Sequence, residues 1–408
     1  MSEIFESIES CRLCQSKKTL DVLDLGDQPP ANSLYKAGET KPVSVPLRIV
    51  FCEDCSTVQL GESVDPQYLF REYIWVTGTS TTADQYSQEF AKSALAKCVA
   101  SQPSVAEIAS NDGTFLRRFL DSGCDVLGID PAKNIADVAT NKGIPTLAEF
   151  FTVDLAKRLV EEKGQKDIVF ARNVLPHVKE ILSVVDGIKT LLKDDGVGII
   201  EFHDAGLILK ELHYDSIYHE HLFLFSLKTI SQLLAKYDLH VFDIMPSPIS
   251  GGSWVIYFST KQRSKTENVI KAEQHEQETG INTYVRWLEF AKQTKAHGKE
   301  LKKMVSENKG KIVAYGASAR SSTLLNFCGI NSDHISFIID KNLLKHGLLT
   351  PGSDIPVISF EQGLEEIKNV DRILLLAWNF KDEIVRDLRN AGFSGEFIIP
   401  FPNKTYIV

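Results

Sequence analysis

The pattern of apolar and polar positions is most informative in residues 105–130. An apolar run at residues 105–108 is followed by small, turn-forming residues that end at Gly113. Apolar residues then recur at helical spacing over residues 114–120, and a second apolar run ends at Asp130. Together these segments predict a strand, a tight loop, a helix and a second strand.

The same alternation of strand and helix patterns continues along the chain. Residues 82–100 have the spacing of an amphipathic helix, and the charged residues 261–307 predict long helices that bridge domains. We therefore expect an α/β fold with a doubly wound domain over roughly residues 82–299, followed by a smaller α/β unit. The strands on which this prediction depends are residues 167–177, 196–203 and 254–258 in the first unit, and residues 335–340 and 372–379 in the second.

Length and composition fit a globular protein of several domains. A chain of 408 residues is too long for one ordinary hydrophobic core. The net charge of −9 argues against nucleic acid as a partner. No apolar run is long enough to span a bilayer, and the first residues lack the basic and apolar parts of a signal peptide. We therefore expect a cytoplasmic protein with no membrane partner, whereas the oligomeric state, a monomer included, is left open.

Four of the seven cysteines form two C-x-x-C pairs. In each pair the two thiolates can converge on one ion, and two pairs complete a tetrahedral zinc site with no open position for catalysis. One such pair alone could be a redox motif, but two pairs favour structural zinc. A zinc ribbon that binds nucleic acid is disfavoured because the nearby charges are acidic. The expected ligands are Cys11, Cys14, Cys52 and Cys55.

The loop after the first strand lacks the G-x-G-x-x-G fingerprint of dinucleotide sites, because Gly113 is its only glycine. Glu107 and Asp112 would flank a ligand there, and Asp130 would accept hydrogen bonds from ribose hydroxyls. Two acids repel a diphosphate but suit an amino group and a sulfonium. The pattern therefore favours S-adenosylmethionine (SAM) over NAD, with a plain turn that carries exposed acids as the alternative.

Residues 216–226 contain a second candidate site, in which Tyr218, His219, Glu220 and His221 are consecutive. Histidine can accept a proton near neutral pH, Glu220 could orient it or share its charge, and Tyr218 can donate to a developing oxyanion. A general base is the favoured interpretation. The alternatives are a metal site, with His219 and His221 on one face of a strand, and a structural cluster without chemistry.

Further polar residues lie where a parallel sheet binds its ligands. Asn173 and His177 follow a buried strand, and ligands lie at the carboxyl ends of such strands. In the second unit, Ser318 and Arg320 belong to a loop that suits a phosphate. Tyr73, before the first long helix, either contacts a ligand or only packs. The alternative in each case is a polar loop, or an inert domain, that binds nothing.

These motifs, in this order, resemble the sugar C-methyltransferase family, which acts on nucleotide-linked 4-keto-deoxy sugars. Two positions depart from the family pattern. Ala109 stands where such loops usually have glycine, and Leu224 stands where an aromatic hydroxyl is common, which leaves the sugar open. The resemblance covers nearly the whole chain and includes the two cysteine pairs and residues 107–113, 173–177, 218–221, 314–320 and 377–379.

The resemblance implies a zinc module at residues 1–75, a SAM-dependent methyltransferase domain at residues 76–300, and a Rossmann-like domain at residues 301–408 that helps bind the sugar nucleotide. The implied activity is methyl transfer from SAM to carbon 3 of a 4-keto-6-deoxyhexose linked to dTDP or GDP. An O- or N-methyltransferase and a non-catalytic zinc-containing binding protein are the alternatives.

The resemblance also implies a role for each candidate residue. His221 would be the base, with Tyr218 and Glu220 beside it in the active site. The implied SAM-binding residues are Glu107, Ala109, Asn111, Asp112, Gly113, Asp130 and Asn173, and the implied substrate-binding residues are Tyr73, His177, Tyr315, Ser318, Arg320 and Asn379.

Overall fold

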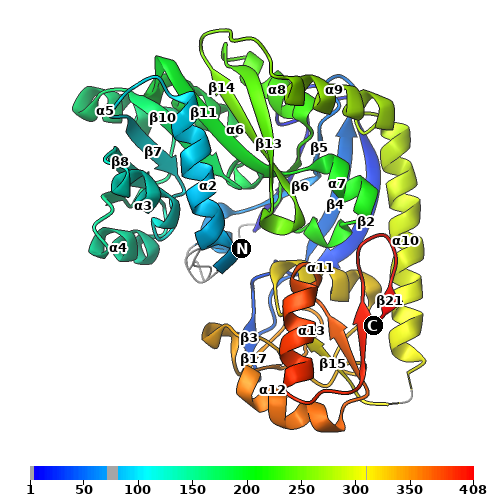
Figure 1. The fold of residues 1–408 in the computed structure, drawn as a ribbon. Helices are drawn as coiled ribbons and strands as arrows, with labels where there is room; N and C mark the ends of the chain where they lie inside the picture. The colour runs from blue at the N-terminus through cyan, green and yellow to red at the C-terminus, as the bar shows by residue number, and fades with distance from the viewer. Residues whose placement is uncertain (1–3, 71–80, 309) are drawn as a thin grey trace.

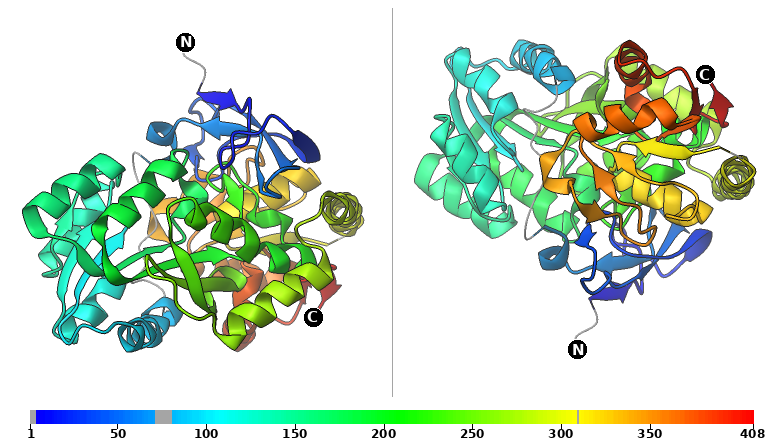
Figure 2. Two further views of the ribbon diagram at one scale, coloured as in Figure 1. Left: turned by 90° about the horizontal axis from the view of Figure 1, so that it is seen from above. Right: turned by 90° about the horizontal axis from the view of Figure 1, so that it is seen from below.

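The computed structural model describes residues 4–70, 81–308 and 310–408. Three regions follow one another along the chain, an N-terminal region built mainly of strands and two α/β regions, and the N-terminal strands lie against both of the others (Figures 1 and 2). Tyr73 lies outside the described residues, so its predicted contact with a ligand stays a prediction. Among the helices of the described residues, none combines the length and the apolar character needed to cross a bilayer.

The central region is built on a seven-stranded sheet with the order β13-β14-β11-β10-β7-β8-β9. The five neighbouring strands β11, β10, β7, β8 and β9 are parallel. Strands β14 and β13 continue the sheet in antiparallel pairs. The strands are β7 (Ser104–Ile108), β8 (Asp125–Ile129), β9 (Thr146–Leu147), β10 (Lys166–Arg172), β11 (Leu192–His203), β13 (His240–Ser247) and β14 (Ser253–Ser259).

Helices cover both faces of this sheet, which confirms the predicted doubly wound fold. The sheet lies between two hydrophobic cores, and alternate residues of its central strands face opposite cores. Val105 and Phe170 pack in the first core with Phe90 and Phe115, whereas Ala106 packs in the second core. The first core lies under α2 (Thr81–Lys97) and α3 (Thr114–Asp121), and the second under α5 (Val153–Lys163), α6 (Ile181–Leu191) and α8 (Leu227–Ala235). The remaining helices of the region are α4 (Lys133–Asn141) and α7 (Ala205–Glu211).

The N-terminal region shares strands with both of the others. Its main sheet has the order β12-β5-β4-β2, in which β12 (Phe223–Leu224) comes from the central region. Its β3 (Tyr35–Lys36) pairs with β17 (Leu348–Leu349) of the C-terminal region. The other elements are β1 (Phe5–Ser7), β2 (Thr19–Gln28), β4 (Val45–Cys52), β5 (Val58–Leu60), β6 (Glu62–Val64) and α1 (Pro66–Phe70).

The C-terminal region is a second, smaller Rossmann-like unit with the sheet order β18-β16-β15-β19-β20-β21. Two helices, α9 (Glu267–Thr279) and α10 (Tyr284–Ser306), lead into it, and α10 runs along the side of the molecule (Figure 1). The predicted boundary at residue 300 falls inside α10. The region contains β15 (Ile312–Tyr315), α11 (Ala319–Cys328), β16 (Ile338–Ile339), β18 (Val357–Ile358), α12 (Phe360–Glu366), β19 (Arg372–Leu375), α13 (Lys381–Asn390), β20 (Glu396–Ile399) and β21 (Tyr406–Ile407).

Candidate functional site

The loop between β7 and α3 turns tightly because three of its residues have positive φ. The values are 53° at Ala109, 49° at Asn111 and 77° at Gly113. A Cβ atom on Gly113 would lie 2.9 Å from Cγ1 of Ile144, so this position requires glycine for both its conformation and its space. The tight turn lies at the carboxyl end of β7, where parallel sheets bind their ligands.

Asp130 fixes this loop to the end of β8. Its two carboxylate oxygens accept hydrogen bonds from the backbone amides of Asn111 and Ala132, at 2.8 and 2.9 Å. Burial raises the pKa of Asp130, and the two amide hydrogen bonds oppose that rise. Each carboxylate oxygen keeps a second lone pair, so Asp130 can still accept from ribose hydroxyls.

Glu107 is buried under the loop with one unsatisfied oxygen. Its Oε2 atom has no hydrogen-bond partner in the described structure. Burial raises the pKa of Glu107 well above its usual value, Arg172 opposes the rise, and Asp130 and Asp112 add to it. Arg172 is itself bound to Glu201, with 2.7 Å between Nε and Oε2. A cation at this loop would satisfy the unpaired oxygen, so the residues present fit the ammonium group of SAM.

Asp112 faces the protein interior. Its carboxylate accepts from Thr114 Oγ1 at 2.6 Å and pairs with Lys142 at 2.9 Å. Burial by itself would raise the pKa of Asp112, but these two partners outweigh it and lower the pKa. The two acids therefore differ, since Glu107 in β7 has an unpaired oxygen and Asp112 in the loop is paired. Asn173, with a φ of 51°, follows β10 at the same edge of the sheet.

His221 has the hydrogen bonds of a neutral base. Its Nδ1 lies 2.7 Å from the carbonyl oxygen of Ser216, and its Nε2 lies 2.8 Å from the hydroxyl oxygen of Tyr218. Since a carbonyl only accepts, Nδ1 carries the proton, and the Nε2 lone pair accepts from the tyrosine hydroxyl. Burial, together with the neighbouring His177, holds the pKa of His221 well below its usual value. The ring is therefore neutral near pH 7, with its lone pair on Nε2.

The structure brings His177 and His221 together from distant parts of the chain. His177 ends the short 3₁₀ helix η2 (Leu175–His177) after β10, and the two imidazole rings meet edge-on with 4.7 Å between centroids. Burial lowers the pKa of His177 to about 4. Both residues thus lie in one cluster near the carboxyl end of the central sheet.

Glu220 is held by the N-terminal region. Its Oε1 accepts from the side-chain amide of Asn32 at 2.6 Å. Burial raises the pKa of Glu220 to about 7, although the hydrogen bond from Asn32 by itself lowers this pKa. The partner that orients the His221 ring at Nδ1 is the Ser216 carbonyl, whereas the sequence suggested Glu220. Sequence reasoning missed Asn32 and Ser216, because neither has a local pattern that indicates chemistry.

The metal alternative at the histidines is wrong. Residues 218–221 form a turn, and His219 Nε2 contacts the carbonyl oxygen of Val45 at 3.1 Å, away from the ring nitrogens of His221. Among the described residues, the four cysteines are the one group of three or more potential metal ligands whose donor atoms converge.

The four cysteine thiols fit a tetrahedral metal site. The Sγ atoms of Cys11 and Cys55 are 3.6 Å apart, those of Cys14 and Cys52 are 3.5 Å apart, and all four lie within 4.8 Å of one another. Zinc–sulfur bonds of about 2.3 Å in a tetrahedron place the sulfur atoms about 3.8 Å apart. None of the four forms a disulfide. The residues therefore fit a closed, structural zinc site.

Arg320 joins the C-terminal region to the central region. Its guanidinium makes two hydrogen bonds, of 3.0 and 2.7 Å, to the carboxylate of Asp215 in the 3₁₀ helix η3 (Tyr214–Ser216). Trp378 donates from Nε1 to the same carboxylate at 2.8 Å, and the guanidinium lies 4.8 Å from the centroid of the tryptophan ring. The charge predicted to bind phosphate is thus balanced by a carboxylate, and its role as a ligand stays a prediction.

We expect Arg320→Ala to lower the free energy of unfolding by about 3 kcal/mol, because it leaves the Asp215 carboxylate buried without its cation. Urea-induced unfolding measures the change, with the exposed Arg386→Ala as the matched control. Adding Asp215→Asn should recover part of the loss, since no unpaired charge then remains. An unchanged unfolding curve for Arg320→Ala would show that the pair does not stabilise the contact between the regions.

The other predicted substrate residues of the C-terminal region lie in different environments. Ser318 caps α11 by accepting from the amide of Ser321, and the Ser321 hydroxyl returns the contact as a capping box. Tyr315 is buried at the end of β15, and Asn379 is exposed in the 3₁₀ helix η7 (Trp378–Phe380). Arg320 and Asn379 nevertheless lie near one another, because a Cβ atom added to Gly251 would lie 3.6 Å from Nη1 of Arg320 and 4.0 Å from Cβ of Asn379.

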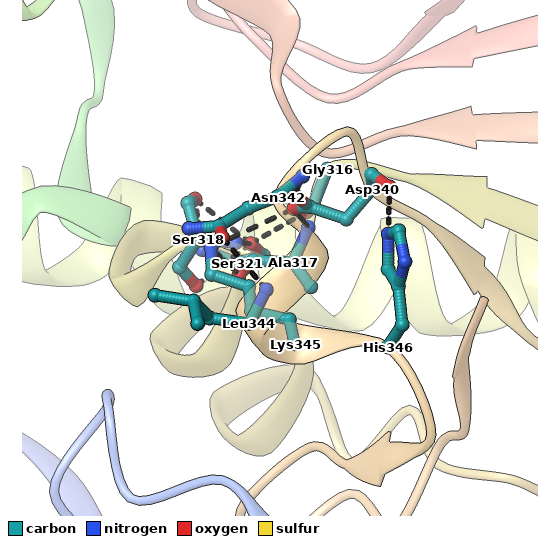
Figure 3. A network of polar contacts seen from close by, with 9 residues as sticks. All are labelled: Gly316, Ala317, Ser318, Ser321, Asp340, Asn342, Leu344, Lys345 and His346. Carbon is teal, nitrogen blue, oxygen red and sulfur yellow. Dashed lines mark hydrogen bonds and ion pairs between the residues drawn. The ribbon is translucent and has the colours of Figure 1, made fainter. Parts of the chain in front are cut away.

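The C-terminal region repeats the hydrogen-bond pattern of the central loop. Asp340 follows β16 and accepts from the amides of Ala317 and Asn342, at 2.7 and 2.8 Å (Figure 3). Lys345 Nζ lies 3.6 Å from the Asp340 carboxylate. Asp340 thus has the same position in its sheet as Asp130 has in the central sheet. The sequence signal that could have identified Asp340 is an acid directly after the second strand of the unit.

Comparison with known proteins assigns all three regions. Residues 11–70 match the family described as "Putative zinc binding domain", residues 83–244 match "Methyltransferase domain", and residues 248–402 match "C-methyltransferase C-terminal domain". The chain is 31% identical over 422 residues to C-methyltransferase NovU from Streptomyces niveus, in an alignment that covers 100% of this chain and 99% of the relative.

Two solved structures match part of the chain. The PH0226 protein from Pyrococcus horikoshii is 19% identical, with a TM-score of 0.38, over 48% of this chain and 100% of its own. The magnesium protoporphyrin IX methyltransferase from Synechocystis with bound SAM is 14% identical, with a TM-score of 0.36, over 48% of this chain and 97% of its own. On the full-length match to NovU and the three family regions, this chain belongs to the family of SAM-dependent C-methyltransferases.

Proposed function

We propose that this enzyme transfers the methyl group of SAM to carbon 3 of a 4-keto-6-deoxyhexose linked to a nucleoside diphosphate, either dTDP or GDP. The observation that carries the proposal is the neutral His221, whose Nε2 lone pair faces the Tyr218 hydroxyl at 2.8 Å. Methylation at carbon requires removal of a C–H proton, and a C–H bond beside a ketone is acidic enough for an imidazole to accept its proton.

The reaction begins with proton transfer from carbon 3 to Nε2 of His221. The electron pair of the broken C–H bond spreads onto the neighbouring ketone oxygen, and the Tyr218 hydroxyl shifts its hydrogen bond from Nε2 to that oxygen. The carbon then forms a bond to the methyl group while the bond from methyl to sulfur breaks, and its electron pair returns to sulfur. SAM supplies the electrophilic methyl group, and alignment of the two reactants supplies much of the rate.

Two sets of residues would bind the reactants. In the central region, Glu107 would hold the ammonium group of SAM and Asp130 the ribose, with Ala109, Asn111, Asp112, Gly113 and Asn173 shaping the loop around them. The sugar nucleotide would contact His177 in the central region, Tyr73 before α2, and Tyr315, Ser318, Arg320 and Asn379 in the C-terminal region. The interaction of Arg320 with Asp215 means that a diphosphate would have to share this cation.

Product mass tests the proposal directly. The zinc-loaded enzyme is incubated with SAM and a dTDP-linked, then a GDP-linked, 4-keto-6-deoxyhexose that carries deuterium at carbon 3. We expect a gain of one methyl in place of the deuterium, in a bond that survives mild hydrolysis. Methyl gain with retention of deuterium would mean transfer to oxygen or nitrogen, and binding of SAM without any gain would mean a different acceptor.

Glu107→Gln should weaken SAM binding by about tenfold, which corresponds to the loss of one charged hydrogen bond. It should also change the dependence of stability on pH. The folded-state pKa of Glu107 is raised, so the wild-type protein loses stability as pH rises through that pKa, and the glutamine variant should not.

Calorimetric titration with SAM and thermal unfolding between pH 5 and 9 measure the two effects. The exposed Glu161→Gln on α5 is the control and should match the wild type in both. A Glu107→Gln variant that binds SAM as tightly as wild type would remove Glu107 from the binding site.

A further inference from the structure

We propose that Asn32 of the N-terminal zinc module is a positioning residue of the active site, which holds the carboxylate of Glu220 in place for the reaction. The inference rests on the proposed function, in which Glu220 is an active-site residue. The zinc module would then contribute directly to catalysis as well as to the stability of the fold.

The contact joins residues that are far apart in the chain. Asn32 and Glu220 are separated by 188 residues, yet the Asn32 amide nitrogen lies 2.6 Å from Glu220 Oε1. Glu220 is only 4% exposed as a residue, whereas Asn32 is exposed. A buried carboxylate is costly unless a donor satisfies it, and Asn32 supplies that donor from another region of the protein.

The segment that carries Asn32 is anchored around and after the residue. Around it, the amide of Ser33 donates to the carbonyl oxygen of Pro30 at 3.0 Å, which closes a turn that contains Asn32. After it, β3 pairs with β17, and the Tyr35 hydroxyl donates to the carboxylate of Asp354 in the C-terminal region. These contacts restrict the positions from which the Asn32 amide can reach Glu220.

The loop that carries Glu220 is anchored to the same module. His219 contacts the carbonyl oxygen of Val45 in β4 at 3.1 Å, and β12 pairs with β5 immediately after the loop. The module therefore contacts the loop on both sides of Glu220, at the His219 ring and at β12, and also the Glu220 side chain itself.

Asn32 should also determine the protonation of Glu220. An N–H donor stabilises the carboxylate form, so its removal should raise the pKa of Glu220 further. The titratable groups that flank Glu220 are His177 on η2, which interacts with the Glu220 backbone, and Tyr218, His219 and His221 on its own loop.

Three variants separate positioning from mere stability. Asn32→Leu removes the donor, Asn32→Asp replaces it with a second acid, and Ser33→Ala is the control one residue away. Zinc content and thermal unfolding of the full-length protein establish that each is folded. The protein is labelled with ¹³C at the glutamate carboxyls, and the Glu220 signal, assigned by its loss in Glu220→Gln, is titrated from pH 5 to 9.

We expect the Glu220 pKa to rise by about one unit in Asn32→Leu, and by more in Asn32→Asp, with no change in Ser33→Ala. We further expect Asn32→Leu to lower kcat about tenfold at pH 7 with little change in KM, and to have no added effect in the Glu220→Gln background.

An unshifted Glu220 titration in Asn32→Leu, or a shifted titration with a wild-type kcat, would overturn the inference. If the unmodified enzyme does not methylate any 4-keto sugar nucleotide, the proposed function fails instead. The titration would still decide whether Asn32 holds Glu220, because it needs no substrate.

Discussion

His221→Asn is expected to lower kcat for methyl transfer by about 10²–10⁴-fold, the usual contribution of a general base. Asparagine can still donate to the Ser216 carbonyl, which His221 Nδ1 approaches to 2.7 Å, but it has no basic nitrogen to accept the carbon 3 proton of the proposed reaction. Binding of SAM should be unchanged, because the β7 loop and Asp130 are untouched. Exchange of the carbon 3 proton with solvent should fall together with kcat.

The measurement compares turnover, SAM affinity and hydrogen exchange at carbon 3 in the same preparations. His275→Asn is the matched control, since it makes the same substitution at an exposed position on α9. Near-normal turnover by His221→Asn, with both ligands bound, would exclude His221 as the base. In that case the neighbouring His177, with 4.7 Å between the ring centroids, would be the next candidate.

Cys52→Ser is expected to lower the zinc content well below one ion per chain and the melting temperature by about 10 °C. Structural zinc sites of small domains contribute on the order of 10–16 kcal/mol of apparent binding free energy, and that energy stabilises the fold. Cys52 ends β4, the strand that also presents Val45 to His219. Turnover should therefore fall by more than tenfold even in the fraction that remains folded.

Metal analysis and thermal unfolding test this expectation, with Cys98→Ser as the control, because Cys98 lies outside the cysteine cluster. Chelation of zinc from the wild-type protein should reproduce the effects of Cys52→Ser. Full zinc content and an unchanged melting temperature in Cys52→Ser would show that the four thiols do not hold a metal that stabilises the module.

The features that the sequence could determine are those with a local pattern. The strand, loop and helix from β7 to α3 follow from apolar spacing, and the structure confirms their order. The paired cysteines indicated a zinc site because two thiols three residues apart can reach one ion. The position of His177 after a strand likewise indicated the edge of the sheet where ligands bind, and there the structure places it beside His221.

The features that only the tertiary structure decided depend on partners distant in the chain. Asn32 lies 188 residues from Glu220, and Arg320 lies 105 residues from Asp215. The sequence marked Arg320 as a cation for phosphate, but could not show that a buried carboxylate neutralises it. It also could not show that Asp112 turns toward Lys142, or that a main-chain carbonyl fixes the tautomer of His221. Periodicity and motif spacing report the short-range geometry of the backbone, whereas burial and charge pairing arise only when distant segments pack together.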